Sequence, residues 1–115
     1  MWPSDKKVYL ASFAVDMRKS IDGLSILVSS HLEQNPTDGA LYVFCNRSHN
    51  KIKILYWDCN GFCLWYKRLE RQRFQLPKPS DGMYTLEARQ LEWLLSGLDF
   101  TCLQGHKRLS YSAFY

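Results

Sequence analysis

The chain has 115 residues, a net charge of +4 and a hydrophobic fraction of 46%, a composition typical of one soluble globular domain rather than of a disordered chain. No apolar run is long enough for a transmembrane helix, and the first seven residues lack the apolar stretch of a signal peptide. We therefore expect a cytoplasmic protein without membrane contact, with a single domain over residues 1–115 and a C-terminal tail over residues 100–115.

The first third of the sequence predicts a strand followed by an amphipathic helix. Val8–Ala11 is a short apolar run and is typical of a strand. Apolar residues then recur at helical intervals, namely at Met17, Ile21, Leu24, Val28 and Leu32. Asp16 is a suitable N-cap, and Asn35-Pro36 is a stop signal. We expect the helix to run from Met17 to Gln34.

The middle of the sequence predicts an antiparallel meander of three strands. The segments rich in β-forming residues are Leu41–Asn46, Lys51–Trp57 and Phe62–Leu69. The first connection is a polar turn, and the second contains Asn60-Gly61, a hairpin signal. If both turns contain four residues, Phe44 lies opposite Lys53 and Trp57 lies opposite Phe62. Val43 and Ile54 then share one buried face.

The C-terminal part predicts a short strand at Met83–Thr85 and a second helix from Leu86 to Ser96. Leucines line one side of this helix, at positions 91, 94, 95 and 98, and Gly97 follows as a C-cap. The predicted fold class is α+β, with an antiparallel β-meander packed by two main helices.

The positive charge is concentrated in residues 47–73, which hold seven Lys or Arg against two acids, whereas the rest of the chain has a net charge of −1. A local basic stripe is the electrostatic footprint of a polyanion partner. Cations contact phosphates, and aromatic rings between them can stack on unpaired bases. The alternatives are a solvated face, a protected sheet edge, or a second core face that a helix or a partner covers.

The candidate nucleic-acid-binding residues share this segment and are cationic or aromatic: Arg47, Lys51, Lys53, Trp57, Tyr66, Lys67, Arg68, Arg71 and Arg73. In the expected register, one sheet face carries Lys51, Lys53, Trp57, Tyr66 and Arg68. If about four cations contact phosphates, the logarithm of affinity should fall against the logarithm of salt concentration with a slope near −3.6.

Neither a catalytic centre nor a cofactor site is indicated. Cys45, His49, Cys59 and Cys63 do not match the spacing of a standard zinc site. Asp16 is explained as a helix cap and Asp58 as a turn residue, and no nucleophile or phosphate-loop motif occurs. We expect a protein that is not an enzyme and that neither cuts nor joins DNA with Mg²⁺ or Mn²⁺. A small nuclease is the competing hypothesis, and it lacks clustered acidic ligands.

Several segments together resemble a known family. They are Asp16–Leu24, Leu41–Phe44, Lys51–Asp58, Gly61–Phe74 and Gln90–Asp99. In this order they are similar to the small TnpB-type accessory protein, the product of the second reading frame of bacterial insertion sequences of the "sixty-six" family.

This resemblance implies an accessory role in DNA transposition, without established enzymatic activity and alongside the transposase and the other accessory protein of the same element. We expect the protein to bind DNA or to bridge the transposase to DNA. The alternative is a protein–protein adaptor in the transposition complex without nucleic-acid contact. The resemblance supplies no site residues.

Overall fold

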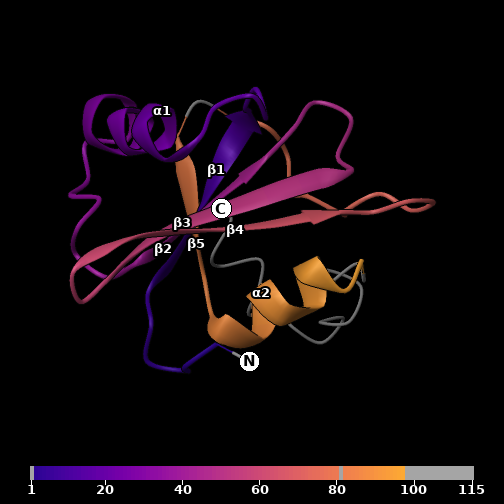
Figure 1. Ribbon diagram of the computed structural model, residues 1–115. Helices are drawn as coiled ribbons and strands as arrows, with labels where there is room; N and C mark the ends of the chain where they lie inside the picture. Colours follow the sequence, from indigo (N-terminus) through magenta and orange to yellow (C-terminus); the bar gives the residue numbers. More distant parts are fainter. Residues whose placement is uncertain (1, 81, 98–115) are drawn as a thin grey trace.

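The computed structural model describes residues 2–80 and 82–97, and these form a five-stranded sheet with a helical layer on each face (Figure 1). The elements in chain order are β1 (Val8–Ala14), α1 (Ile21–Ile26), a π-helical turn η1 (Leu27–His31), β2 (Leu41–Cys45), β3 (Lys51–Asp58), β4 (Gly61–Arg68), β5 (Met83–Leu86) and α2 (Ala88–Leu95). The expected α+β class is confirmed. Leu98 and the expected tail at 100–115 lie outside the described residues.

The sheet has the strand order β4-β3-β2-β1-β5. The predicted meander of β2, β3 and β4 is confirmed, and so is its register, because Phe44 pairs with Lys53 and Trp57 pairs with Phe62. The predicted meander does not specify which strand pairs with the first strand. In the structure β1 is parallel to β2 and antiparallel to β5. Parallel neighbours need a crossover connection, and α1 with η1 provides it.

The expected hairpin at Asn60-Gly61 is present, and the chain turns within the four residues expected. Asp58 pairs with Gly61, so that the two central residues are Cys59 and Asn60. The left-handed conformation belongs to Cys59, with φ of 53°, rather than to Gly61. The turn is tighter than expected because β3 continues to Asp58 and β4 begins at Gly61, each one residue closer to the turn than the expected strand ends.

The first helix is shorter than the interval pattern predicts. It begins after Ser20, and a π-helical turn replaces its second half, with Leu32 N–H donating to Leu27 O at 3.1 Å. Asp16 is not its N-cap, because the Asp16 carboxylate instead accepts hydrogen bonds from Arg18 in the preceding loop. Such local side-chain bonds compete with helix formation. The expected apolar face is confirmed, since Leu24 and Val28 are fully buried.

The second helix also starts later than expected, at Ala88. Glu87 precedes it, and the Glu87 N–H donates to the Gln90 Oε1 at 2.8 Å, which supplies a partner for a backbone donor at the helix start. Leu91, Leu94 and Leu95 are buried as expected. Neither helix in the described part of the chain is long and apolar enough to cross a membrane.

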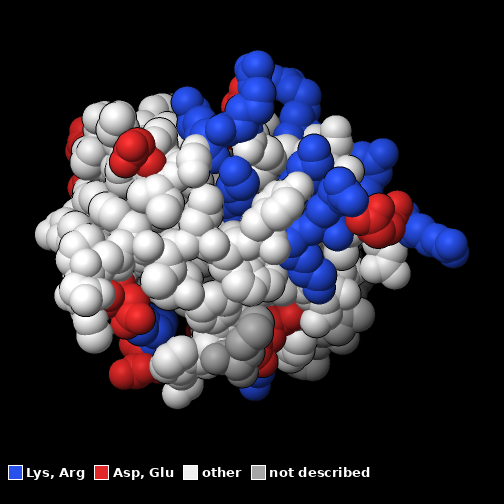
Figure 2. Space-filling model, viewed as in Figure 1, with Lys and Arg blue, Asp and Glu red and all other residues white. Residues whose placement is uncertain are grey.

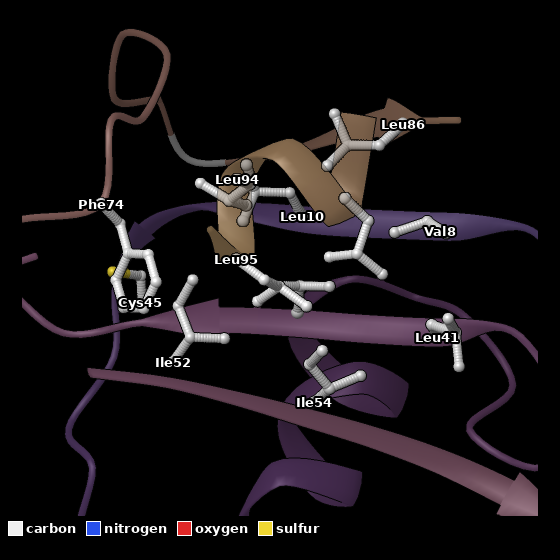
Figure 3. Packing of buried hydrophobic residues seen from close by; sticks show 12 residues of the cluster. Val8, Leu10, Leu41, Cys45, Ile52, Ile54, Phe74, Leu86, Leu94 and Leu95 are labelled. Carbon is white, nitrogen blue, oxygen red and sulfur yellow. The ribbon is translucent and has the colours of Figure 1, made fainter. Parts of the chain in front are cut away.

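Each face of the sheet has its own hydrophobic core. The α2 face collects alternate residues of the strands, as Figure 3 shows, together with the leucines of α2. The α1 face includes Tyr42, Phe44 and Leu55, all fully buried beneath Leu24 and Val28. This part of the aromatic face is therefore a second core, which was one of the alternatives for the stripe. All five residues of β2 are buried, as expected for a strand covered on both faces.

Phe74 closes the α2-side core at the end of the sheet (Figure 3). After β4 the chain turns back, and Phe74 N–H donates to His49 O at 2.7 Å while its ring is 1% exposed. The Phe74→Ala change should cost about 3–5 kcal/mol of unfolding free energy, because it leaves a cavity in a packed core. Urea denaturation measures this cost. The exposed neighbour is the control, and Gln75→Ala should change stability by less than about 0.5 kcal/mol.

A Phe74→Ala protein as stable as the Gln75→Ala protein would show that residues 69–76 are not anchored in the core.

Candidate nucleic-acid interface

Two loops meet at the end of the sheet where the parallel strands β1 and β2 terminate. The residues after β1 are Val15–Arg18, and those after β2 are Asn46–Asn50. Val15 N–H donates to Cys45 O at 2.9 Å, which ties the first loop to the end of β2. Because parallel strands place their carboxyl ends at the same end of the sheet, side chains far apart in sequence come together here.

The β2–β3 turn is held in one conformation by its own polar groups. The Asn46 Oδ1 accepts from the backbone N–H of Asn50 and of Lys51, each at 3.0 Å. The Arg73 Nη1 donates to Ser48 O at 2.7 Å from the segment that follows β4. Arg47 is exposed on this braced turn. Its backbone position is therefore fixed before any ligand arrives.

The two loops enclose an open hollow of about 650 Å³, called here the basic hollow. It is lined by Ala14–Arg18, Asn46–Ser48, Lys51 and Tyr66. Its charged groups are Arg18, Arg47 and Lys51 against Asp16, so the hollow is net positive. Lys51 pairs across the strands with Arg68, which extends the positive charge along the sheet face.

Figure 2 shows how this charge is distributed over the surface. Lys and Arg side chains gather on the upper right, over the end of the sheet where Figure 1 places the β2–β3 turn and the segment after β4. The centre of the same view is largely uncharged, and the left carries scattered acidic side chains. On this face the positive charge is therefore concentrated at one end, a distribution that favours an anionic partner.

Asp16 and Arg18 form an ion pair at the rim of the basic hollow. The shortest contact joins Arg18 Nη2 to Asp16 Oδ2 at 2.7 Å, and the Arg18 side chain is 91% exposed. Hydrogen bonds from Arg18 lower the pKa of Asp16 to about 2, and Asp16 raises the pKa of Arg18 above its ordinary value. Arg18 is thus held in place at the rim with its guanidinium open to solvent.

Lys53 lies next to the basic hollow but serves the fold. Its ammonium donates to the carbonyl oxygens of Met17 and Lys19, both at 2.8 Å, and it stands 5.7 Å from the centroid of the Tyr66 ring. The Lys53 ammonium therefore serves mainly to hold the β1–α1 loop over the sheet. Tyr66 below it is 48% exposed and, with Ile26, is one of the two exposed large hydrophobic residues among those described.

The remaining candidates from the sequence are spread over the molecule. Trp57 is half-buried and packs edge-on against Phe62, with 5.0 Å between ring centroids. Lys67 points to the opposite, α2 face, where its ammonium donates to Leu95 O at 2.8 Å. Arg71 and Arg73 are exposed in the segment after β4. The structure thus brings together Arg47, Lys51, Tyr66 and Arg68, and places Lys67 apart from them.

The residue pattern did not reveal that Asp16 and Arg18 belong to this surface. The charge count locates the positive excess in residues 47–73, which exclude Arg18, and the helical pattern assigns Asp16 to an N-cap. A usable signal was present, because a strand, a helix and a second strand in succession are typical of a βαβ unit, whose strands are parallel. Arg18 follows the first of these strands, at the edge where such units gather loop residues.

The three cysteines that the structure describes do not form a metal site. Cys45 is buried in the α2-side core, Cys59 is exposed at the β3–β4 turn, and Cys63 lies on β4. Burial raises the pKa of the Cys45 thiol to about 12, which keeps it protonated. In residues 2–80 and 82–97 no group of three or more His, Cys, Asp or Glu side chains is placed to hold a metal ion.

Comparison with known proteins places the chain in a family. A family model described as "IS66 Orf2 like protein" matches residues 6–105. The chain belongs to the IS66 Orf2-like family. This membership implies an accessory protein of IS66 transposition, as the resemblance of the sequence motifs indicated.

Two relatives of this IS66 Orf2-like protein come from Sinorhizobium fredii (strain NBRC 101917 / NGR234), and both are described as uncharacterized. The protein y4hO is 39% identical over 102 residues, which is 87% of this chain and 89% of y4hO. The protein y4jC is 33% identical over 95 residues, covering 83% of this chain and 81% of y4jC. No solved structure matches the chain significantly.

The structural use of Lys53 can be measured by its removal. Lys53→Met should lower the unfolding free energy by about 1–2 kcal/mol, because two backbone carbonyls lose a charged donor. The neighbouring Lys51 has no such bond among the described residues, so Lys51→Met should change stability by less than about 0.5 kcal/mol. Chemical denaturation of both variants gives the comparison. Equal effects of the two changes would contradict the role assigned to Lys53.

The ion pair at the rim predicts an unusual titration. Because the pKa of Asp16 is lowered, the carboxylate persists at acidic pH and its interaction with Arg18 is lost only as pH falls through about 2. NMR of the Asp16 carboxyl carbon should show this midpoint. Arg18→Ala should raise the midpoint toward about 3.9, the ordinary value for aspartate. The same midpoint in both proteins would exclude the ion pair in solution.

Proposed function

We propose that this IS66 transposition accessory protein is not an enzyme and that it binds DNA through the basic hollow, thereby bridging the transposition machinery to DNA. The observation that supports this proposal most directly is the convergence of cations from separate elements. Arg18 follows β1, Arg47 follows β2, and Lys51 and Arg68 start β3 and end β4. A solvated face needs no such convergence, whereas phosphate groups require closely spaced positive charge.

The contacts proposed are to the phosphate backbone. Arg18 and Arg47 expose planar guanidinium groups, which suit phosphate oxygens. A phosphate at the rim competes with the Asp16 carboxylate for Arg18, and this competition costs little because the pair is solvent-exposed. Tyr66 is the ring available in the basic hollow for an unpaired base. Trp57 is less available because it is half-buried against Phe62.

The alternative is an adaptor that contacts only proteins. The observation in its favour is the largely uncharged surface across the front of the molecule in Figure 2. The two proposals differ in one measurable respect, since an adaptor without nucleic-acid contact has no affinity for DNA even at low salt.

Fluorescence anisotropy titrations across a range of salt concentrations distinguish these proposals. If Arg18, Arg47, Lys51 and Arg68 each contact a phosphate, the slope of log K against log salt should be near −3.6 on duplex DNA, from about −0.9 per contact. The double variant Arg18→Ala/Arg47→Ala should bind any DNA sequence more weakly. Its slope of log K against log salt should be less negative by the contribution of about two phosphate contacts. With Mg²⁺ present, the DNA should remain uncut.

The matched control removes the same charge elsewhere. Lys7 precedes β1 at the opposite edge of the sheet, and Arg89 lies on α2, where it pairs with Glu87. The double variant Lys7→Ala/Arg89→Ala should keep the wild-type slope. Equal losses in both double variants would mean that binding follows net charge rather than the basic hollow. Absence of binding by the folded wild-type protein would favour the adaptor.

A further inference from the structure

Within residues 2–80 and 82–97, the outer side of β4 is an open sheet edge of unusual character. Among the described strands β4 pairs only with β3, and its register is regular from Gly61 to Arg68. Exposed edges normally carry charges, prolines or bulges that prevent further pairing. The central residues 62–66 are instead Phe, Cys, Leu, Trp and Tyr. Figure 1 shows β4 crossing the front of the sheet, where Figure 2 shows mostly uncharged side chains.

The unpaired backbone groups of β4 belong to its even-numbered residues. Just beyond the strand, Leu69 N–H donates to Asn50 O at 2.8 Å. Hydrogen bonding alternates along an antiparallel pair, so the odd-numbered residues of β4 bond to β3. The N–H and C=O groups of Phe62, Leu64 and Tyr66 therefore point outward. When two copies of β4 pair antiparallel with their even-numbered residues opposite one another, these N–H and C=O groups form hydrogen bonds between the copies.

We propose that the protein forms a homodimer in which the β4 strands of two copies pair antiparallel about a two-fold axis at Leu64. This register places Leu64 opposite Leu64, Phe62 opposite Tyr66, and Cys63 opposite Trp65 of the second copy. Each contact joins uncharged side chains, with a small residue opposite the large indole. The two five-stranded sheets become one continuous sheet.

The pairing of the two β4 strands extends cross-strand rows of side chains that already exist within one copy. On the α1 face, Leu55 lies opposite Leu64, so the axis creates a row of four leucines across the two copies. Trp57 packs on Phe62 at 5.0 Å, and the row continues through Tyr66 and Lys53 of the second copy. Aromatic cross-strand neighbours stabilise sheets. The exposed Tyr66 ring gains a neighbour in this arrangement.

Charge complementarity selects a second copy and this register. Asp58 is exposed and lies opposite Gly61, and the register sets Lys67 of the second copy on the far side of Gly61. The Lys67 ammonium donates to Leu95 O of its own copy at 2.8 Å, and its other two N–H groups remain for a carboxylate. The two opposite charges are on the same face, with no side chain between them. A parallel pairing would instead place Lys67 and Arg68 beside their own counterparts, which is destabilising.

Gly61 is otherwise unexplained. Its φ lies outside the left-handed region, and an added Cβ would meet nothing within 4 Å. Neither backbone conformation nor packing within one copy therefore requires glycine, although glycine weakens a strand. In the dimer, the missing side chain leaves the path between Lys67 and Asp58 open.

Sedimentation velocity of the full chain tests the proposal. From about 1 to about 100 μM, the mass should approach twice the 13.6 kDa of one chain. Leu64→Lys places two like charges opposite each other at the axis, so the dimer dissociation constant should rise at least about tenfold. The control is Ile26→Lys, because Ile26 is 61% exposed on α1, away from the edge. This variant should dimerise as the wild type does.

A second variant avoids any change in the strand itself. Asp58→Lys removes the partner of Lys67 and adds a repelling charge, so the dissociation constant should rise about three- to tenfold. Asp58 is exposed, so the fold should persist, which thermal unfolding confirms. Asp5→Lys makes the same change of net charge at another exposed position and should leave dimerisation unchanged.

Cross-linking tests the register. In a chain with Cys59, Cys63 and Cys102 replaced by serine, Leu64→Cys should form a disulfide dimer on oxidation. The two Cα atoms are then about 5.5 Å apart, within the range for a disulfide. Phe62→Cys is the control, because its two copies lie roughly 13 Å apart along the strands.

A monomer at all concentrations would overturn the proposal, as would a dimer that Leu64→Lys leaves intact or equal cross-linking at positions 62 and 64. None of these results bears on DNA affinity, which the basic hollow variants measure separately.

Discussion

The parallel pairing of β1 with β2 dictates how the helices cover the sheet and where the basic hollow forms. Parallel neighbours cannot be joined by a tight turn, so the chain between them must cross one face of the sheet, and α1 with η1 covers that face. The same pairing puts β1 between β2 and β5, which lets α2 cover the other face. It also brings the loop after β1 to the turn after β2, where the basic hollow forms.

The structure separates lysines that stabilise the fold from cations that are exposed to solvent. Lys53 and Lys67 each donate to backbone carbonyls, one at the β1–α1 loop and the other at the end of α2, so they join the sheet to both helical layers. Arg47 and Arg18 expose guanidinium groups to solvent. A count of charges along the chain gives the total but cannot distinguish a lysine that braces the fold from one that meets a phosphate.

The two proposed surfaces are compatible in one assembly. A two-fold axis perpendicular to a sheet keeps the α1 face of both copies on the same side. Each copy has its basic hollow on that side, at the end of β4 away from the hairpin turn. A dimer built on β4 would therefore present two positively charged surfaces in the same direction. This arrangement suits the proposed role in binding DNA.

The antiparallel meander follows from the amino-acid sequence alone, because side-chain alternation has a period of two and four-residue turns leave only one register with apolar residues together. The sequence also determined the inward face of the first helix and the location of the positive charge along the chain. The parallel partner of β1 emerges only in the folded chain, because pairing between distant segments leaves no local pattern. For the same reason, the tertiary structure alone brought Arg18 to Arg47, committed Lys53 to the Met17 and Lys19 carbonyls, and turned Lys67 to the other face.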